Sequence, residues 1–298
     1  MVGLIFYPEF MLKIKPIVNA KMNTYHLLSN FIFSNNKEDN ETSLDNLIEE
    51  AIQENNYSFF DGLLGVGWLI SYLTKNDMLE ADVDEILYEV DDHIYKMTIN
   101  AVVKNQLDLD YLLQLISYCH QRLLNVINPK NIYRRFALIE SLKLLIDKAC
   151  ILTENHYSSL PVEKAKFLLK LSYLINTSFF EKDIEVFFYK NIEYLIGHYQ
   201  KKLPNSFQYE DQNALCYLLL TSKQYSNPYW VQQIVNIINL VDYSEANLNV
   251  LRNVADSYNP LIQNSILVDL PHSHKEDSLI FLLASNLKSI TFHKFNVS

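Results

Sequence analysis

Two histidines separated by one residue, His272 and His274, stand near the C-terminal end of the chain, and Glu276 and Asp277 follow them. A His-x-His pair with a neighbouring carboxylate can bind a metal ion. The same residue types are also typical of a polar loop before a helix, where acidic side chains favour the helix N-terminus. We expect this second role, because the histidines follow a proline and directly precede an apolar segment.

Acidic residues precede most of the apolar segments, at Asp61, Asp108, Asp110, Glu210, Asp211, Glu245, Glu276 and Asp277. Sugar hydrolases use two carboxylates, but the spacing singles out no pair here. An acidic residue at a helix start contributes about 0.5 to 2 kcal/mol to helix stability without any catalytic role. No nucleophile, base and orienting group can be assigned from the spacing, so the catalytic residues stay unknown.

Three of the five glycines lie within six residues, at Gly62, Gly65 and Gly67, and Trp68 follows them. The spacing differs from the G-x-G-x-x-G of dinucleotide-binding folds, and no strand pattern precedes it. Gly62 and Gly65 are one helical turn apart, where missing side chains let a neighbouring segment approach closely. We expect close packing at the start of a buried helix; a ligand surface lined by backbone is the alternative.

The composition favours long helices joined by short loops. The chain has 298 residues, 49% of them hydrophobic, with only five glycines and eight prolines, fewer turn residues than an all-β fold of this length needs. A formal net charge of -10 excludes nucleic acid as a partner. Three scattered cysteines indicate free thiols, and no apolar stretch is long enough to cross a membrane, so we expect a cytoplasmic protein.

Segments of two kinds alternate along the chain. Segments such as 63–73, 109–119, 167–175, 214–220 and 279–287 are apolar nearly all round, whereas those near 86–97 and 184–195 have one charged face. The pattern predicts an all-α fold: an α/α toroid of about six to seven helical hairpins, with buried inner and amphipathic outer helices. We expect these leucines in the core: Leu63, Leu69, Leu113, Leu115, Leu168, Leu218 and Leu282.

Residues 1–298 are expected to form one domain, in which 1–21 are irregular or precede the true start of the protein. The polar run 35–42 is expected to be a loop, and Ser43 the N-cap of the next helix. The tetrapeptide Leu-Ile-Ser-Tyr occurs at 69–72 and again at 115–118, which indicates a repeat of helix pairs.

In a toroid the inner helices all run the same way, so the loops that precede them meet at one end. This end would form an acidic rim, and an acidic rim attracts a cationic peptide segment. The predicted peptide-binding rim consists of Asp61, Asp108, Asp110, Glu210, Asp211, Glu245, His272 and His274.

The segment 62–73 and the acidic segment 76–87 after it resemble the repeat of lanthionine synthetase C-like (LanC-like) proteins. In that repeat a helix with the motif Gly-Leu-x-Gly-Ile-Gly-Trp is followed by an asparagine turn and an acidic outer helix. The resemblance covers about 30 residues. It implies an α/α toroid of inner and outer helices, and family enzymes that cyclise ribosomal peptides by adding cysteine thiols to dehydrated serine or threonine.

Members of this family hold zinc with a Trp-Cys-x-Gly cysteine and a later Cys-His pair followed by glycine. Here no cysteine follows Trp68 or Trp230, and the one Cys-His pair, Cys119 and His120, is followed by Gln121. Cys119 and His120 are the remaining candidates for a metal site, and we expect no zinc and no other cofactor.

The sequence therefore predicts a degenerate, zinc-free LanC-like protein that binds a peptide substrate or a partner enzyme during ribosomal peptide modification. One alternative is an active enzyme on the same scaffold, either a thioether-forming peptide cyclase with an unusual metal site or a carbohydrate-active toroid. The other is a helical-repeat scaffold without catalysis.

Overall fold

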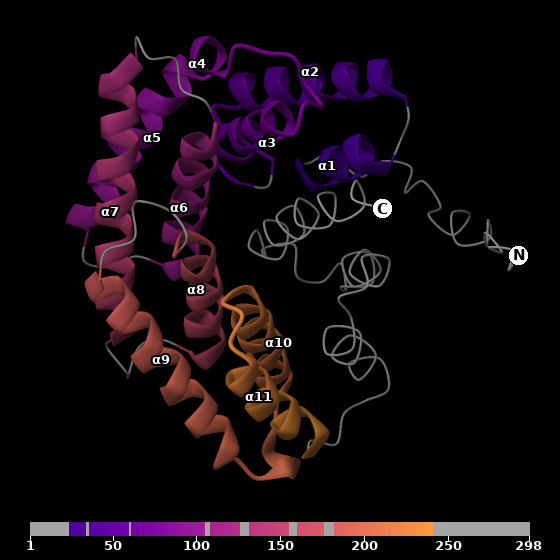
Figure 1. The fold of residues 1–298 in the computed structure, drawn as a ribbon. Coiled ribbons are helices and arrows are strands. Elements are labelled where there is room, and N and C mark those ends of the chain that lie inside the picture. The colour runs from indigo at the N-terminus through magenta and orange to yellow at the C-terminus, as the bar shows by residue number, and fades with distance from the viewer. Residues whose placement is uncertain are drawn as a thin grey trace, which may run out of the picture.

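A computed structural model describes residues 24–33, 36–59, 61–104, 108–125, 131–154, 160–175 and 182–240 (Figure 1). These residues form helices and no strand. The α-helices are α1 Thr24–Phe33, α2 Lys37–Gln53, α3 Leu63–Lys75, α4 Val83–Ile86, α5 Tyr88–Val103, α6 Leu109–Leu124, α7 Ile132–Glu154, α8 Pro161–Leu174, α9 Lys182–Gln200, α10 Tyr209–Gln224 and α11 Pro228–Leu240, and Pro204–Ser206 form the 3-10 helix η3. The predicted all-α class is confirmed.

The helices from α3 onward lie in two rows. In the inner row, α3 packs on α6, α6 on α8 and α8 on α10. In the outer row, α5 packs on α7 and α11 on α9, while α6–α7, α8–α9 and α10–α11 join the two rows. Figure 1 shows the rows bending together into an arc, with α7 and α9 on its outer side and α1 and α2 beside α3 at one end.

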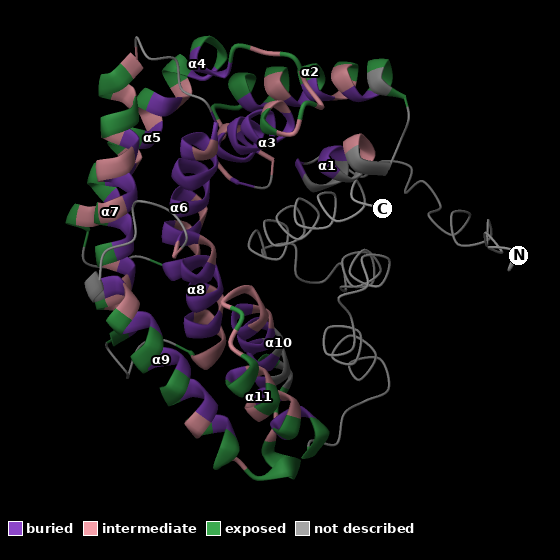
Figure 2. Ribbon diagram, in the orientation of Figure 1, coloured by how far each residue is buried: buried purple, intermediate pink, exposed green. Residues whose placement is uncertain are grey.

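Burial follows the predicted alternation of helix types. Figure 2 shows α6 and α8 buried along most of their length, whereas α7 and α9 alternate between buried and exposed residues. The core contains the expected Leu69, Leu113, Leu115, Leu168 and Leu218. Leu63 is only half-buried, because it is the first residue of α3 and lies at the helix end. Leu282 lies outside the described residues.

From Lys37 onward the polar run expected to be a loop is helical, and the prediction that Ser43 caps the next helix is wrong. Helix α2 begins at Lys37, and its first turn carries Glu38 and Asp39, which favour the positive end of the helix dipole. Lysine and glutamate are also good helix formers. Asn40, Leu44 and Leu47 form the buried stripe of this helix, so its polar face is a solvated face rather than a loop.

Two short segments separate the helices α9, α10 and α11. The 3-10 helix η3 lies between α9 and α10, and Ser226, with a φ of 59°, separates α10 from α11. The Asn227 side-chain oxygen accepts hydrogen bonds from the backbone N–H groups of Tyr229 and Trp230, which fixes the start of α11. No helix in the described part of the chain is long and apolar enough to cross a membrane.

Candidate functional site

The glycine cluster permits two close approaches at the start of α3. Gly62 is the N-cap residue, and a Cβ atom there would lie 2.6 Å from the backbone oxygen of Asn56. At Gly65 a Cβ would lie 1.7 Å from the backbone oxygen of Phe59. Close packing is confirmed, because the chain before α3 occupies the space over both glycines. Trp68 is buried one turn later and stacks on Tyr72.

Gly67 has a different neighbour. A Cβ at Gly67 would lie 2.8 Å from Cε2 of the Tyr118 ring, which belongs to α6. The third glycine therefore makes room for an aromatic side chain from the next inner helix. This side chain is part of a buried polar network that the sequence did not predict.

The described residues of the predicted rim have contacts typical of helix starts. The Asp108 carboxylate accepts a hydrogen bond from the N–H of Asp110, and Asp110 forms an ion pair with Lys166 at 3.6 Å. The Asp211 carboxylate accepts from the N–H of Gln208 at 2.7 Å and from Lys202.

Two further rim residues are described. The Asp61 carboxylate accepts hydrogen bonds from the side chains of Asn56 and Ser58, and Glu210 is exposed. The ion pair between Asp110 and Lys166 joins the first turn of α6 to the second turn of α8, so these inner helices begin at the same end. Glu245, His272 and His274 lie outside the described residues.

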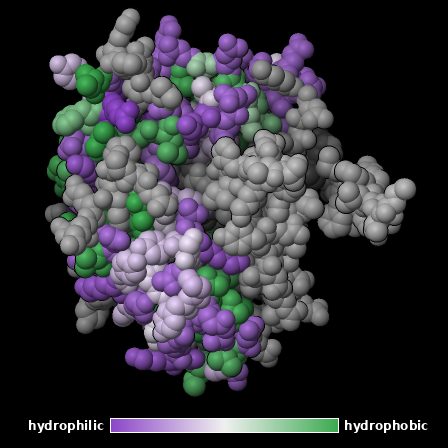
Figure 3. All heavy atoms as spheres, in the orientation of Figure 1, coloured by the Kyte–Doolittle hydropathy of each residue, from purple (hydrophilic) through white to green (hydrophobic). Residues whose placement is uncertain are grey.

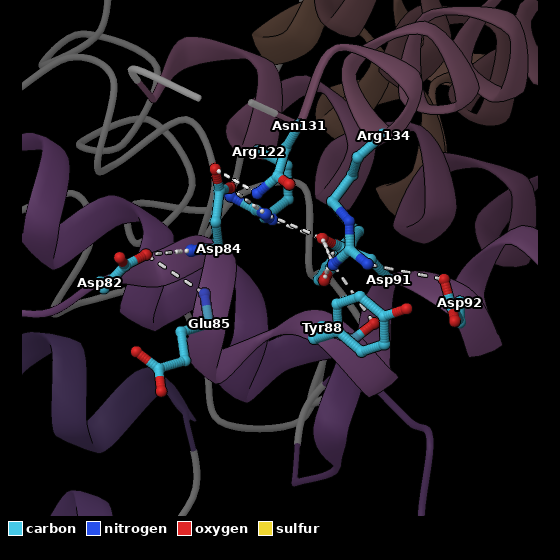
Figure 4. A network of polar contacts seen from close by, with 10 residues as sticks. Asp82, Asp84, Glu85, Tyr88, Asp91, Asp92, Arg122, Asn131 and Arg134 are labelled. Carbon is cyan, nitrogen blue, oxygen red and sulfur yellow. Dashed lines mark hydrogen bonds and ion pairs between the residues drawn. The ribbon is translucent and has the colours of Figure 1, made fainter. Parts of the chain in front are cut away.

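The centre of the polar network is the buried carboxylate of Asp91 on α5 (Figure 4). Its Oδ1 accepts from the Tyr118 hydroxyl at 2.6 Å and from Nε of Arg122 at 3.1 Å. Its Oδ2 accepts from Nη2 of Arg122 at 2.7 Å and from Nη1 of Arg134 at 3.1 Å. Four donors from α6 and α7 therefore fill both oxygens of one acid.

A second carboxylate, that of Asp84, joins the network at the same Arg122 nitrogen that donates to Asp91. Nη2 of Arg122 donates to Oδ1 of Asp84 at 3.0 Å, and the Asn131 side chain donates to Oδ2 at 3.3 Å. Burial alone would lower the pKa of Arg122, but the hydrogen bond and charge of Asp91 raise it above its ordinary value. Burial and the charge of Asp91 also raise the pKa of Tyr118, so its hydroxyl stays protonated and donates. The network ties α4, α5, α6 and α7 together.

A cavity of about 350 Å³ lies next to this network, between α5 and α7. Asp91 and Arg134 belong to both, and the buried thiol of Cys119 also borders the cavity. The aromatic and charged residues of its lining are Tyr88, Tyr95, Tyr133, Asp91, Asp92 and Arg134. The guanidinium carbon of Arg134 lies 4.2 Å from the centre of the Tyr88 ring, which is a cation–π contact.

The surface around the cavity is rich in exposed apolar side chains. Tyr133 is 86% exposed, and Phe136 and Ile132 on the same end of α7 are 63% and 65% exposed. Figure 3 shows hydrophobic residues among hydrophilic ones along the edge of the molecule that α7 occupies. Exposed aromatic residues beside a cavity are typical of a surface that binds another molecule.

Cys119 and His120 lie side by side on α6, and both are buried. Nδ1 of His120 is 3.1 Å from Nζ of Lys170 on α8. Within the described ranges no group of three His, Cys, Asp or Glu side chains is placed to hold a metal ion. A lysine amine beside the histidine also disfavours a cation there, so these residues do not fit the zinc site of the family that the sequence resembles.

Sequence reasoning missed Asp91, Arg122, Arg134 and Lys170, although one signal was present. Lys170 is a charged residue inside the apolar segment 167–175, and Arg122 follows the apolar segment 109–119 by three residues. A charge within an all-round apolar helix must be buried, so it requires a partner or a changed pKa.

Comparison of the chain with protein-family models, with curated proteins and with solved structures gives no match. The function proposed below therefore depends on the geometry of the described residues.

Proposed function

We propose that this protein binds a cationic peptide segment, without catalysing a reaction on it, in the cavity between α5 and α7. The observation that carries the proposal is the combination of exposed tyrosines, a cavity of about 350 Å³ and a fixed charge network at its base. Tyrosine suits such a surface because its ring gives a large contact area at little cost in side-chain entropy.

The charges favour a basic partner. The carboxylates of Asp91 and Asp92 and the guanidinium of Arg134 border the cavity, which leaves one negative charge in excess. The whole chain has a formal net charge of -10. The negative charge at the cavity and the negative net charge of the chain both attract cations and raise their association rate at low salt.

The proposal includes the wider class of the protein. The proposed class is a LanC-like α/α toroid, which is supported by Gly62, Gly65 and Trp68 at the start of a buried inner helix and by the two rows of helices. We propose that it is zinc-free, cytoplasmic and engaged with a peptide substrate or an enzyme of ribosomal peptide modification. The cavity is preferred to the acidic rim as the binding site because most of the described rim acids already bind helix starts or lysines.

Selection from a phage-displayed random peptide library against the immobilised full-length protein tests this function. We expect enriched peptides with basic residues, and fluorescence anisotropy should show that the double variant Tyr88→Ala/Tyr133→Ala binds them at least about tenfold more weakly. Tyr229→Ala is the matched control, because Tyr229 is 63% exposed and lies on α11. Equal binding by the double variant and the wild type would contradict the proposal.

Metal analysis of the purified protein tests the zinc-free part separately. Stoichiometric zinc that is lost in both Cys119→Ala and His120→Ala would contradict it and would favour an enzyme of the cyclase type.

A further inference from the structure

The cavity contains a cation–π contact within the protein, and a ligand could make a contact of the same kind. The Arg134 guanidinium lies over the Tyr88 ring, and this tyrosine is still 58% exposed. Tyr95, about two turns further along α5, is 46% exposed, and Tyr133 faces the same cavity from α7. Aromatic rings with exposed surface can therefore stack on a second planar cation.

The two acids that line the cavity differ in how many hydrogen bonds and ion pairs they already make. Asp91 is buried, and its oxygens accept hydrogen bonds from Tyr118, Arg122 and Arg134. Asp92 is 59% exposed, and its contact with Nη2 of Arg134 is long, at 3.7 Å. A donor that enters the cavity can approach the Asp92 carboxylate from solvent, whereas both oxygens of Asp91 already accept hydrogen bonds.

These features discriminate between classes of ligand. An anion would meet two carboxylates and an Arg134 that already donates to Asp91 and to the backbone oxygen of Tyr88. An ammonium group could pair with Asp92 but would gain less from the rings. A guanidinium group is planar, stacks on tyrosine and can donate two parallel hydrogen bonds to one carboxylate.

We infer that the cavity between α5 and α7 binds the guanidinium group of an arginine side chain, which stacks on the tyrosines and pairs with Asp92. The inference rests on the proposed function, because the arginine would be part of the bound peptide. It adds the chemical group that the cavity recognises and the residue that selects it.

The first test is saturation-transfer NMR of the full-length protein with N-acetylarginine amide, compared with its lysine and citrulline counterparts. Citrulline keeps the shape of arginine but has no charge. We expect a signal from the arginine probe, a weaker one from lysine and none from citrulline. The arginine signal should be lost in Asp92→Asn and kept in Glu89→Gln, the matched control on an exposed acid of α5 that does not border the cavity.

The second test uses the selected peptides. Replacing arginine by citrulline should weaken binding by about tenfold, which corresponds to about 1.4 kcal/mol, and Asp92→Asn should weaken the arginine peptide but not the citrulline peptide. Equal binding of both peptides would overturn the arginine inference while the peptide-binding function remains. An arginine probe that binds Asp92→Asn as well as wild type would overturn it too. If the library yields no peptide, the proposed function fails, and the NMR titration alone decides whether the cavity recognises arginine.

Discussion

The side-chain amine of Lys170 lies 3.1 Å from Nδ1 of His120 in the core between α6 and α8. Both residues are buried, and Nε2 of His120 has no hydrogen-bond partner within the described part of the chain. Either nitrogen of the pair can carry the shared proton. Burial lowers the pKa of Lys170 from its ordinary 10.5 to about 7, and it lowers the pKa of His120 well below 6.5.

This pair predicts a pH-dependent stability. Lys170 binds its proton more weakly in the folded state than in the unfolded state, so protonation favours unfolding. The contribution of Lys170 to the free energy of unfolding should fall as the pH drops from about 10.5 to about 7, with a slope of up to about 1.4 kcal/mol per pH unit. Below about pH 7 this contribution should be constant. Urea denaturation of the wild type and of Lys170→Met across this range measures it, because other titrating groups cancel in the difference.

The same substitution should stabilise the protein at pH 7 by about 1 to 4 kcal/mol, the range seen when buried ion pairs are replaced by apolar residues of similar volume. Lys190→Met is the control, because Lys190 is 67% exposed and its ion pair with Glu154 is long, at 3.8 Å. Parallel stability curves for wild type and Lys170→Met would show that Lys170 is not a strained buried base.

Arg122 should respond in the opposite direction, although it too is a buried cation on an inner helix. Its guanidinium has two carboxylate partners, Asp84 and Asp91, so its removal leaves buried negative charge. We expect Arg122→Met to lower the free energy of unfolding by about 3 to 5 kcal/mol. Arg135→Met, at an exposed position of α7, should change it little. A loss below about 1 kcal/mol for Arg122→Met would mean that the network does not support the fold.

The helices and their burial could be predicted because they depend on local patterns. Leu69, Leu115 and Leu168 are buried, as apolar residues repeated at helical spacing indicate. The composition of the run 35–42 gave a wrong prediction of a loop, since the structure is helical from Lys37 onward. The polar face of a helix and a loop have the same residue types, so composition alone does not distinguish them.

The network at the cavity could not be predicted in this way. Arg122 and Asp91 are 31 residues apart in sequence, and Arg134 and Asp91 are 43 apart. Their meeting depends on how α5, α6 and α7 pack, and no local pattern encodes that. The sequence also shows that Gly67 belongs to a glycine cluster, but it does not show that this glycine makes room for the Tyr118 ring.

The thiols of Cys119 and Cys150 should be unreactive in the folded protein. Burial, with the charge of Asp91 second, raises the pKa of Cys119 to about 12, and burial with Asp147 and Glu154 raises that of Cys150 to about 12. Since the thiolate is the nucleophile, iodoacetamide at pH 8 should leave both unmodified until guanidinium chloride unfolds the chain. Peptide mapping by mass spectrometry resolves each site, and rapid native labelling of Cys119 would contradict its burial.

Two glycines in helices should respond oppositely to alanine. At Gly65 the new Cβ would lie 1.7 Å from the backbone oxygen of Phe59, so the chain before α3 would have to move. Overpacking of this kind typically costs about 1 to 3 kcal/mol, and here the obstacle is backbone rather than a flexible side chain. At Gly197, inside α9, nothing lies within 4 Å of the new Cβ, so alanine should stabilise the helix by about 0.4 to 1 kcal/mol. Urea denaturation of both variants measures the contrast. If Gly65→Ala were as stable as wild type, close packing would not explain the glycine cluster, and a ligand surface at the start of α3 would become the better explanation.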